Sequence, residues 1–121
     1  MKHITRIEEA AVYKFLGHKV IVLVDEEKGA KNVALMIAHF EPQQGVPLHS
    51  HVKSEEIYYG VEGSRMVYVG DKRYEIRPNV AIYIPPGTLH KIDLGDEPLT
   101  IIAIEAPPER IYDIKKAKRI Q

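Results

Sequence analysis

The chain has no cysteine among its 121 residues. Without cysteine it can form no disulfide framework and offers no thiolate as a nucleophile or a metal ligand, so a cytoplasmic location is the default expectation. Asparagine and glutamine are also scarce, whereas isoleucine, lysine and glutamate are abundant. That balance favours a thermophilic source.

An excess of charge is also missing, because 17 basic residues balance 17 acidic ones. Nucleic-acid-binding proteins normally show a net basic surface, and we expect the basic residues 115–119 to be a solvated tail. No apolar run approaches the roughly 20 residues that a membrane-spanning helix needs. The chain starts with no apolar segment of a signal peptide before the acidic pair Glu8 and Glu9. We therefore expect neither a nucleic-acid partner nor a membrane.

What the sequence does contain is a series of short apolar runs rich in valine, isoleucine and tyrosine. Glycine, proline or aspartate separates them, which is typical of β-strands and turns. The predicted strands span residues 12–15, 19–24, 33–40, 48–52, 56–61, 65–69, 72–76, 81–84, 90–94 and 99–106. So many short strands in a chain of one-domain length (1–121) predict an all-β sandwich or barrel. We expect a helical turn within residues 4–11 and a helix or extended arm within 108–120.

Four potential metal ligands give the clearest chemical signal. His49 and His51 are separated by one residue, so in a strand both side chains would point to one face. Glu56 follows after four residues, and His90 comes later, after Pro85-Pro86-Gly87. Imidazole and carboxylate suit manganese, iron, cobalt, nickel or zinc better than calcium or magnesium. Each residue alone has an ordinary structural reading, but together they predict one divalent transition metal per chain, because a cation offsets the cost of burying several titratable groups.

These residues resemble the two sequence motifs of the cupin family. The first motif contains His-x-His, three or four residues, Glu, six residues and Gly, and it is matched by His49, His51, Glu56 and Gly63. The second motif, Pro-x-Gly-x-x-His, is matched by residues 85–90. Both motifs stand in the family's order, so the resemblance is specific.

The resemblance covers about residues 33–106 and has three departures. Gln43 and Asn79 stand where the two motifs begin with glycine, and Leu94 stands where the second motif ends with asparagine. None of the three positions is a metal ligand in the family. The open question is the turn geometry at the first two, although asparagine can adopt turn conformations.

The resemblance implies a cupin jelly-roll barrel, also called a double-stranded β-helix, made of two antiparallel sheets. A barrel brings residues from distant strands to one interior, and by resemblance His49, His51, Glu56 and His90 are the metal ligands. Glu56 is preferred over Glu55 because its distance to the following glycine is the one the motif requires.

Four further residues are candidates for contact with a substrate. Tyr58 shares strand parity with Glu56, and we expect these two to be the catalytic residues. Tyr83, Arg65 and His39 are weaker candidates, of which Arg65 would be the natural partner of a substrate carboxylate or phosphate. If these residues have only a structural role, the tyrosines would be core aromatics, Arg65 would lie on a solvated strand face, and His39 would be a residue of the barrel wall.

As a function, the cupin resemblance implies a metal-dependent enzyme, and the complete ligand set favours a dioxygenase or a decarboxylase. Its small polar substrate would chelate the metal, and Glu56 would alternate between ligand and proton acceptor. The alternatives are a sugar isomerase or epimerase, and a non-catalytic module that binds or senses a small molecule. The fold alone does not decide among them.

The N-terminal strands, within residues 12–24, lie outside the motif-bearing part of the chain. Uncovered strand edges are adhesive, so we expect a homodimer that buries them. Residues 107–121 are expected to form a C-terminal arm, too short for a helix-turn-helix.

Overall fold

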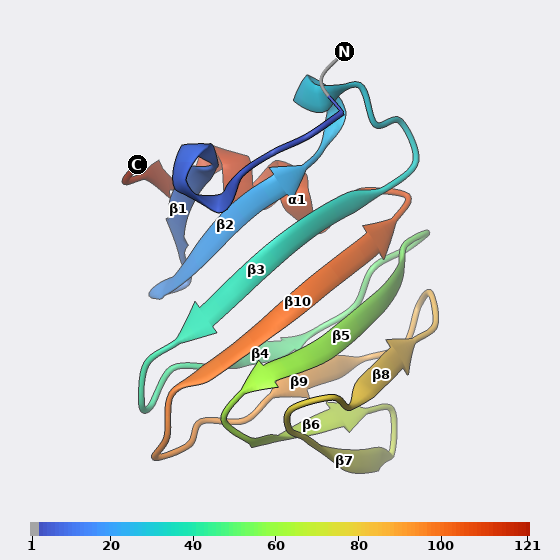
Figure 1. Cartoon of the computed structure of the whole chain (residues 1–121). Coiled ribbons are helices and arrows are strands. Elements are labelled where there is room, and N and C mark those ends of the chain that lie inside the picture. Colours follow the sequence, from blue (N-terminus) through green and yellow to red (C-terminus); the bar gives the residue numbers. More distant parts are fainter. Residues whose placement is uncertain (1–2) are drawn as a thin grey trace.

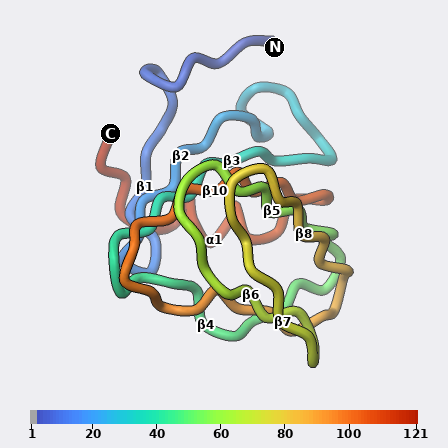
Figure 2. The backbone as a smooth tube through the Cα atoms, turned by 60° about the horizontal axis from the view of Figure 1, so that its bottom comes forward, coloured from blue at the N-terminus to red at the C-terminus, as the bar shows by residue number. Residues whose placement is uncertain are grey.

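The computed structural model describes residues 3–121, so the first two residues of the expected domain lie outside it. The chain forms two antiparallel sheets, of seven and four strands, that face each other across a common interior (Figure 1). From a second direction, β4, β6 and β7 lie opposite β3, β10 and β5 (Figure 2). The predicted all-β architecture of two antiparallel sheets is confirmed.

The larger sheet has the strand order β11-β1-β2-β3-β10-β5-β8, and the smaller sheet has the order β4-β9-β6-β7. The strands are β1 (Ala11–Phe15), β2 (His18–Val24), β3 (Ala34–Phe40), β4 (Val46–His49), β5 (Glu55–Glu62), β6 (Arg65–Val69), β7 (Lys72–Ile76), β8 (Ala81–Ile84), β9 (His90–Ile92), β10 (Leu99–Ala106) and β11 (Lys118–Arg119). The helices are two 3-10 turns, η1 (Ile7–Glu9) and η2 (Glu26–Lys28), and α1 (Arg110–Lys116). No helix within residues 3–121 is long and apolar enough to cross a membrane.

Each of the ten predicted strands has a counterpart, but the strand expected at residues 48–52 is misplaced. β4 ends at His49, and the next residues leave the sheet. Their backbone groups are bound elsewhere: the N–H of Gly87 donates to the carbonyl of His51 at 2.7 Å. The N–H groups of residues 52–54 donate to the carboxylate of Glu109. A backbone engaged in this way cannot join a strand ladder.

The space between the two sheets holds the main apolar core. Along β10, burial alternates with a period of two, so Leu99, Ile101 and Ala103 point inward. The core cluster consists of Ala38, Phe40, Tyr58, Val67, Ile76, Ile82, Ile84, Ile92, Leu99, Ile101 and Ala103. Burying each large side chain contributes about 1.5–3 kcal/mol, so this layer is the main source of stability.

A second core lies where the larger sheet extends beyond the smaller one. Ile111 and Ile114 of α1 pack there against inward side chains of β1 to β3, among them Met36. After α1, β11 pairs with the outer edge of β1, opposite Tyr13 and Lys14. The expectation that these strands present an open edge is therefore wrong, and the homodimer stays a prediction without that support.

The basic residues near the C-terminus are not a free tail. Lys115 forms ion pairs with Asp25 at 2.8 Å and with Glu27 at 3.0 Å. Lys118 and Arg119 form β11. The segment is therefore attached to the larger sheet and is not a free tail, although the side chains of Lys118 and Arg119 are exposed, as predicted.

At the two positions where the motifs usually begin with glycine, the chain has Gln43 and Asn79. Both residues adopt left-handed backbone conformations, with φ of 66° and 69°. Such conformations favour glycine, so hydrogen bonds hold these residues there. The Gln43 side chain donates to the carbonyl of Gly95, and Asn79 accepts a hydrogen bond from the Tyr59 hydroxyl at 2.8 Å. The turns therefore persist without glycine.

Candidate metal centre

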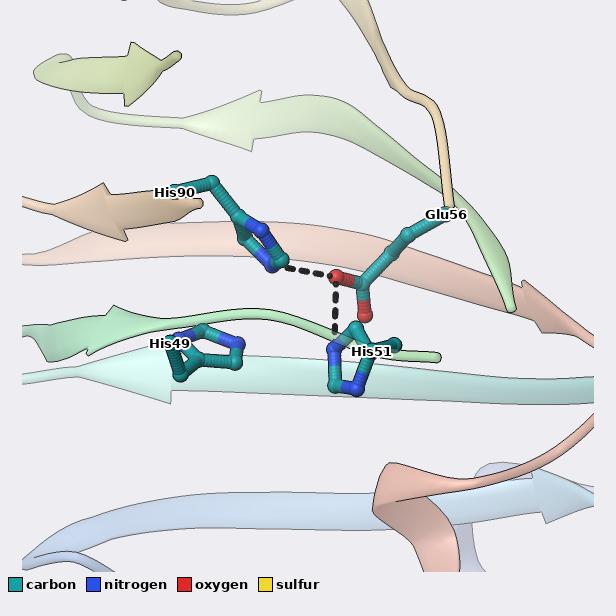
Figure 3. A group of neighbouring side chains, drawn as sticks. All are labelled: His49, His51, Glu56 and His90. Carbon is teal, nitrogen blue, oxygen red and sulfur yellow. Dashed lines mark hydrogen bonds and ion pairs between the residues drawn. The ribbon is translucent and has the colours of Figure 1, made fainter. Parts of the chain in front are cut away.

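Four side chains from separate parts of the chain meet inside the barrel (Figure 3). His49 ends β4, His51 lies in the segment after it, Glu56 is near the start of β5, and His90 begins β9. One potential ligand atom from each residue lies within 4.8 Å of the others. The four predicted ligands are therefore brought together, but His51 reaches the group from a non-strand segment, so the argument from strand alternation is wrong for it.

The backbone sets the orientation of two imidazoles. Nδ1 of His49 lies 2.8 Å from the carbonyl of Pro47, and Nδ1 of His90 lies 2.8 Å from the carbonyl of Thr88. A carbonyl can only accept a hydrogen bond, so both Nδ1 atoms carry the proton and each neutral ring keeps its lone pair on Nε2. This is the arrangement that prepares histidines for a metal.

The contacts of Glu56 show that the group suits a cation. Nε2 of His90 lies 3.1 Å from Oε1 of Glu56, so in the neutral state two acceptors would face each other. Nε2 of His51 lies 3.5 Å from the same oxygen and is buried without a hydrogen-bond partner. A proton or a metal ion between these atoms removes the conflict. Three imidazoles and a carboxylate are a donor set for a divalent transition metal.

The pKa shifts of these side chains indicate that the group contains an ionised carboxylate. Burial would raise the pKa of Glu56, but His51 and His90 outweigh that effect and lower it to about 2. The Glu56 carboxylate raises the pKa of His51, whereas burial lowers the pKa of His49 to about 4. Glu56 is therefore an anion at neutral pH, and His49 is neutral.

The segment that carries His51 is fastened by the beginning of α1. The Glu109 carboxylate accepts hydrogen bonds from the backbone N–H groups of Val52, Lys53 and Ser54 at 3.1, 2.5 and 2.6 Å. The Ser54 hydroxyl donates to the carbonyl of Pro107. The region expected to be an arm therefore positions the segment of a candidate metal ligand.

Glu105 in turn holds the beginning of α1. Its carboxylate, fully buried at the end of β10, accepts hydrogen bonds from the N–H groups of Glu109, Arg110 and Ile111. Carboxylates at a helix N-terminus satisfy otherwise unpaired N–H groups. Sequence reasoning missed Glu105, although its inward parity on β10 was the available signal. No sequence signal pointed to Glu109.

A cavity with about 50 Å³ open to the centre of a water molecule lies beside the ligand group, and His49 and Glu56 are part of its lining. Its wall is mostly apolar, and two of its polar residues were not predicted: His18 and Arg110. His18 had no assigned role because it lies outside the motifs, and Arg110 lay in the expected arm. The lining residues are Phe15, His18, Val20, Met36, Ala38, Phe40, Val46, His49, Glu56, Tyr58, Ile92, Ile101, Ala103, Arg110 and Ile114.

The two tyrosines predicted to contact a substrate, Tyr58 and Tyr83, lie on opposite faces of the larger sheet. Tyr58 is buried and lines the cavity, as its parity with Glu56 predicts. Burial and the nearby Glu56 carboxylate raise the pKa of Tyr58, so its hydroxyl keeps its proton. Tyr83 is 53% exposed on the outside of β8, where its hydroxyl donates to Glu55 at 2.6 Å. Its contact with a substrate therefore stays a prediction that the cavity does not support, and Glu55 lies outside the ligand group.

Arg65 and His39 also lie away from the ligands. Arg65 is buried, and its guanidinium donates to the backbone carbonyls of four loop residues: Glu41, Gln44, Asp93 and Glu97. His39 contacts Thr100 and Glu41 on the outer face of the larger sheet. Neither residue lines the cavity, so their contacts with a substrate stay predictions that this cavity does not support. The position of Arg65 in its strand does not reveal that its guanidinium binds the carbonyls of two loops.

Comparison with protein families settles the classification. The model of the cupin domain matches residues 36–105, more than half of the chain. The chain belongs to the cupin family. As the two motifs imply, the two sheets form the jelly-roll barrel of that family.

Three curated relatives match parts of this cupin. An uncharacterized protein of Methanocaldococcus jannaschii is 44% identical over 50% of this chain and 50% of its own. The dimethylsulfoniopropionate lyase DddW of Ruegeria pomeroyi is 37% identical over 60% of this chain and 47% of its own. The acireductone dioxygenase of Stenotrophomonas maltophilia is 44% identical over 41% of this chain and 29% of its own. The cupin spans half or less of the length of these relatives.

Solved structures agree with the fold. An RmlC-like cupin from Shewanella frigidimarina superposes with a TM-score of 0.81 over 93% of this chain and 96% of its own, at 17% identity. At that identity the likeness concerns the fold alone.

Proposed function

We propose that this cupin is a metal-dependent enzyme of the dioxygenase or lyase type, with decarboxylation among the lyase reactions. The ion would be held by His49, His51, Glu56 and His90. One observation carries the proposal: the buried Nε2 of His51 has no hydrogen-bond partner, and it lies beside a carboxylate oxygen of Glu56 that is also 3.1 Å from Nε2 of His90. The relatives that are a lyase and a dioxygenase support these two reaction types.

The metal would be manganese, iron, cobalt, nickel or zinc. When bound, it would supply Lewis acidity and, if redox-active, electron transfer. Four protein ligands leave open positions on an ion that accepts six, and the cavity beside them lets a small molecule reach those positions. The substrate would therefore be a small molecule that chelates the ion.

Two residues of the chain would handle protons. Glu56 is ionised at neutral pH, so it can accept a proton from a substrate next to it. Tyr58 lines the same cavity and stays protonated, so its hydroxyl can donate a hydrogen bond to charge that develops on the substrate. The apolar walls exclude water from this step.

The cavity is less suited to the two alternatives. A sugar presents hydroxyl groups on every side, and each buried hydroxyl needs a hydrogen-bond partner, whereas most of this lining is apolar. A binding or sensor module would bind its ligand without changing it. Turnover by the metal-loaded protein therefore separates that alternative from an enzyme.

The metal proposal is tested by elemental analysis of untagged protein and two neighbouring variants. We expect about one equivalent of a transition metal in the wild type and in Glu55→Gln, and a loss of most of it in Glu56→Gln. Glu55 is the matched control because it adjoins Glu56 in sequence but lies outside the ligand group. Equal metal content in the two variants, or none in the wild type after reconstitution, would contradict the proposal.

The enzymatic proposal is tested by incubating the metal-loaded protein with small chelating organic acids. Oxygen uptake with product formation would identify a dioxygenase. Cleavage into two products without oxygen uptake, such as release of carbon dioxide, would identify a lyase, whereas an isomer of the substrate would identify an isomerase. Unchanged acids that bind with measurable affinity would instead support the binding module.

We also propose a homodimer that forms through the outer face of the larger sheet. Ile21, Ile37, Ile102 and Tyr59 lie side by side across four neighbouring strands. They point away from the core, since the residues beside them on each strand point inward. Contiguous apolar side chains on a sheet face favour association, and two copies can present the same face to each other.

A further inference from the structure

The wall of the cavity carries an arginine whose guanidinium makes no hydrogen bond or ion pair with the described residues. Arg110, at the start of α1, lines the cavity together with His49 and Glu56. Its guanidinium lies over the ring of Phe15, 4.7 Å from the centroid. Within residues 3–121 its guanidinium has no hydrogen bond or ion pair, because the one hydrogen bond of Arg110 is made by its backbone N–H. Arginine normally binds carboxylate or phosphate, so a free one facing a cavity is a candidate anion site.

His18 is a second, independent sign of a ligand on the same wall. Its side chain is stacked on Phe40, with ring centroids 4.2 Å apart, and it meets the edge of Phe15 at 6.1 Å. The residue is only 4% exposed, yet its Nδ1 has no hydrogen-bond partner. A buried polar atom without a partner costs stability, and a polar ligand atom in the cavity would satisfy it.

The charges of the side chains and of the proposed metal ion favour the binding of an anion in the cavity. A divalent ion beside the Glu56 carboxylate keeps one positive charge, and Arg110 adds a second. Two further acids, Glu105 and Glu109, lie near Arg110, but three backbone N–H groups occupy each of their carboxylates. Burial also raises the pKa of Glu105. Arg110 and His18 both contact the ring of Phe15, and both line the same cavity as His49.

The rest of the lining defines the body of the ligand. Most of the remaining lining residues have aliphatic or aromatic side chains, such as Met36, Phe40 and Ile101. Such a wall offers no partners for a polyhydroxylated molecule, but it buries an apolar one favourably.

We propose that Arg110 and His18 form an anion-binding subsite, and that the molecule bound in this cavity is a carboxylic acid with an apolar body. The guanidinium donates to the carboxylate, His18 contributes its unpaired ring nitrogen, and the apolar body packs against the aromatic wall. The second end of the ligand, which reaches the metal, and the positive charge that the metal would add to the cavity rest on the proposed function. The subsite itself consists of residues outside the metal group.

The experiment measures the binding of benzoate and of benzamide, which has the same shape without the charge, by isothermal titration calorimetry. Both the metal-free and the zinc-loaded protein are titrated. The variants are Arg110→Gln, Arg110→Lys, His18→Phe and, as a control, Arg73→Gln, whose arginine is exposed on β7. Metal content and circular dichroism are recorded for each.

We expect metal-free wild type and Arg73→Gln to bind benzoate at least tenfold more tightly than benzamide. Arg110→Gln should bind benzoate about tenfold more weakly or worse, Arg110→Lys should lie in between, and His18→Phe should lose a few-fold. Arg110→Gln should bind metal as well as the wild type or better, because a neighbouring positive charge is removed. If the substitution instead disrupted the structure of the site, Arg110→Gln would bind less metal than the wild type.

Two results would overturn the subsite: equal benzoate affinity in Arg110→Gln and wild type, or equal affinity of the wild type for benzoate and benzamide. Benzoate binding that requires zinc and ignores Arg110 would likewise overturn it, since the carboxylate would then lie on the metal. If metal-free protein binds benzoate through Arg110 but never takes up a metal, the subsite stands and the proposed enzyme fails.

Discussion

Glu109 and Ser54 lie 55 residues apart in sequence, yet Oε1 of Glu109 accepts the backbone N–H of Ser54 at 2.6 Å. The same carboxylate binds the N–H groups of Val52 and Lys53. These hydrogen bonds lower the pKa of Glu109 against the raising effect of desolvation, so the clamp is ionised at neutral pH. The segment that carries His51 is therefore held by an anion on α1.

Removing this clamp should weaken metal binding without removing a ligand. We expect Glu109→Ala to bind metal about tenfold more weakly, because His51 would no longer be held in place, in line with the effect of losing a group that orients a ligand. Asp113→Asn, an exposed acid on the same helix, should bind metal like the wild type. Competition with a coloured chelator measures both affinities. A wild-type affinity in Glu109→Ala would show that the segment holds its shape alone.

The stability of the metal-free protein should depend on His18 in acid. Burial, and then the charge of Arg110, lower the pKa of His18 from 6.5 to about 4. Between these values the unfolded chain binds a proton at His18 and the folded chain does not, so the free energy of unfolding falls as the pH drops. Over this window the loss is about 3 kcal/mol at most.

The matched variant for this prediction is His18→Phe, which keeps an aromatic ring on Phe40. Urea unfolding at pH 7 and pH 4.5 should show a smaller pH dependence in the variant than in the wild type. His49 contributes a loss of the same sign in both proteins, since its pKa is also lowered to about 4. Equal pH dependence in the two proteins would mean that His18 titrates normally in the fold.

Arg65 should contribute to stability and not to ligand binding. Its guanidinium donates to four backbone carbonyls of two loops, and replacing it with methionine leaves them without donors. We expect Arg65→Met to lower the free energy of unfolding by about 3 kcal/mol or more, with benzoate affinity unchanged. The exposed Arg73→Met should change stability little. If Arg65→Met lost benzoate binding while keeping its stability, the original substrate assignment would be right.

The homodimer should depend on the outer face of the larger sheet. We expect light scattering at micromolar concentration to give twice the mass of one chain. Ile37→Glu, in the middle of the apolar row, should give a folded monomer, because a charge cannot be buried there without a partner. The control Glu75→Gln lies on β7 in the smaller sheet and should stay dimeric. A monomeric wild type would contradict the dimer.

Much of this molecule could be predicted from local patterns. The strands follow from short apolar runs and turn residues, and the four ligands follow from motif spacing. Glu56 could be distinguished from Glu55 by spacing alone, and the structure agrees, because Glu55 lies outside and binds Tyr83. These features depend on neighbours in sequence, so a single sequence reveals them.

The features that could not be predicted depend on contacts between distant segments. Arg110, Glu109 and His18 acquire their roles because α1 folds back onto the larger sheet, and no local pattern specifies that contact. Arg65 has an inward side chain, but only the three-dimensional path of two loops shows that carbonyls surround it. His51 reaches the metal group although β4 has ended, because Gly87 and Glu109 bind the backbone around it.

The position of Glu109 in the chain has a consequence for biosynthesis. It follows all four candidate ligands, so a growing polypeptide exposes every metal-binding side chain before it makes the residue that fixes the His51 segment. We expect tight metal uptake only once α1 has left the ribosome, whereas the strands between the motifs can pair earlier. A chain released after residue 106 should therefore contain folded β-structure and bind zinc weakly. Zinc affinity equal to that of the full chain would show that the order of synthesis does not matter.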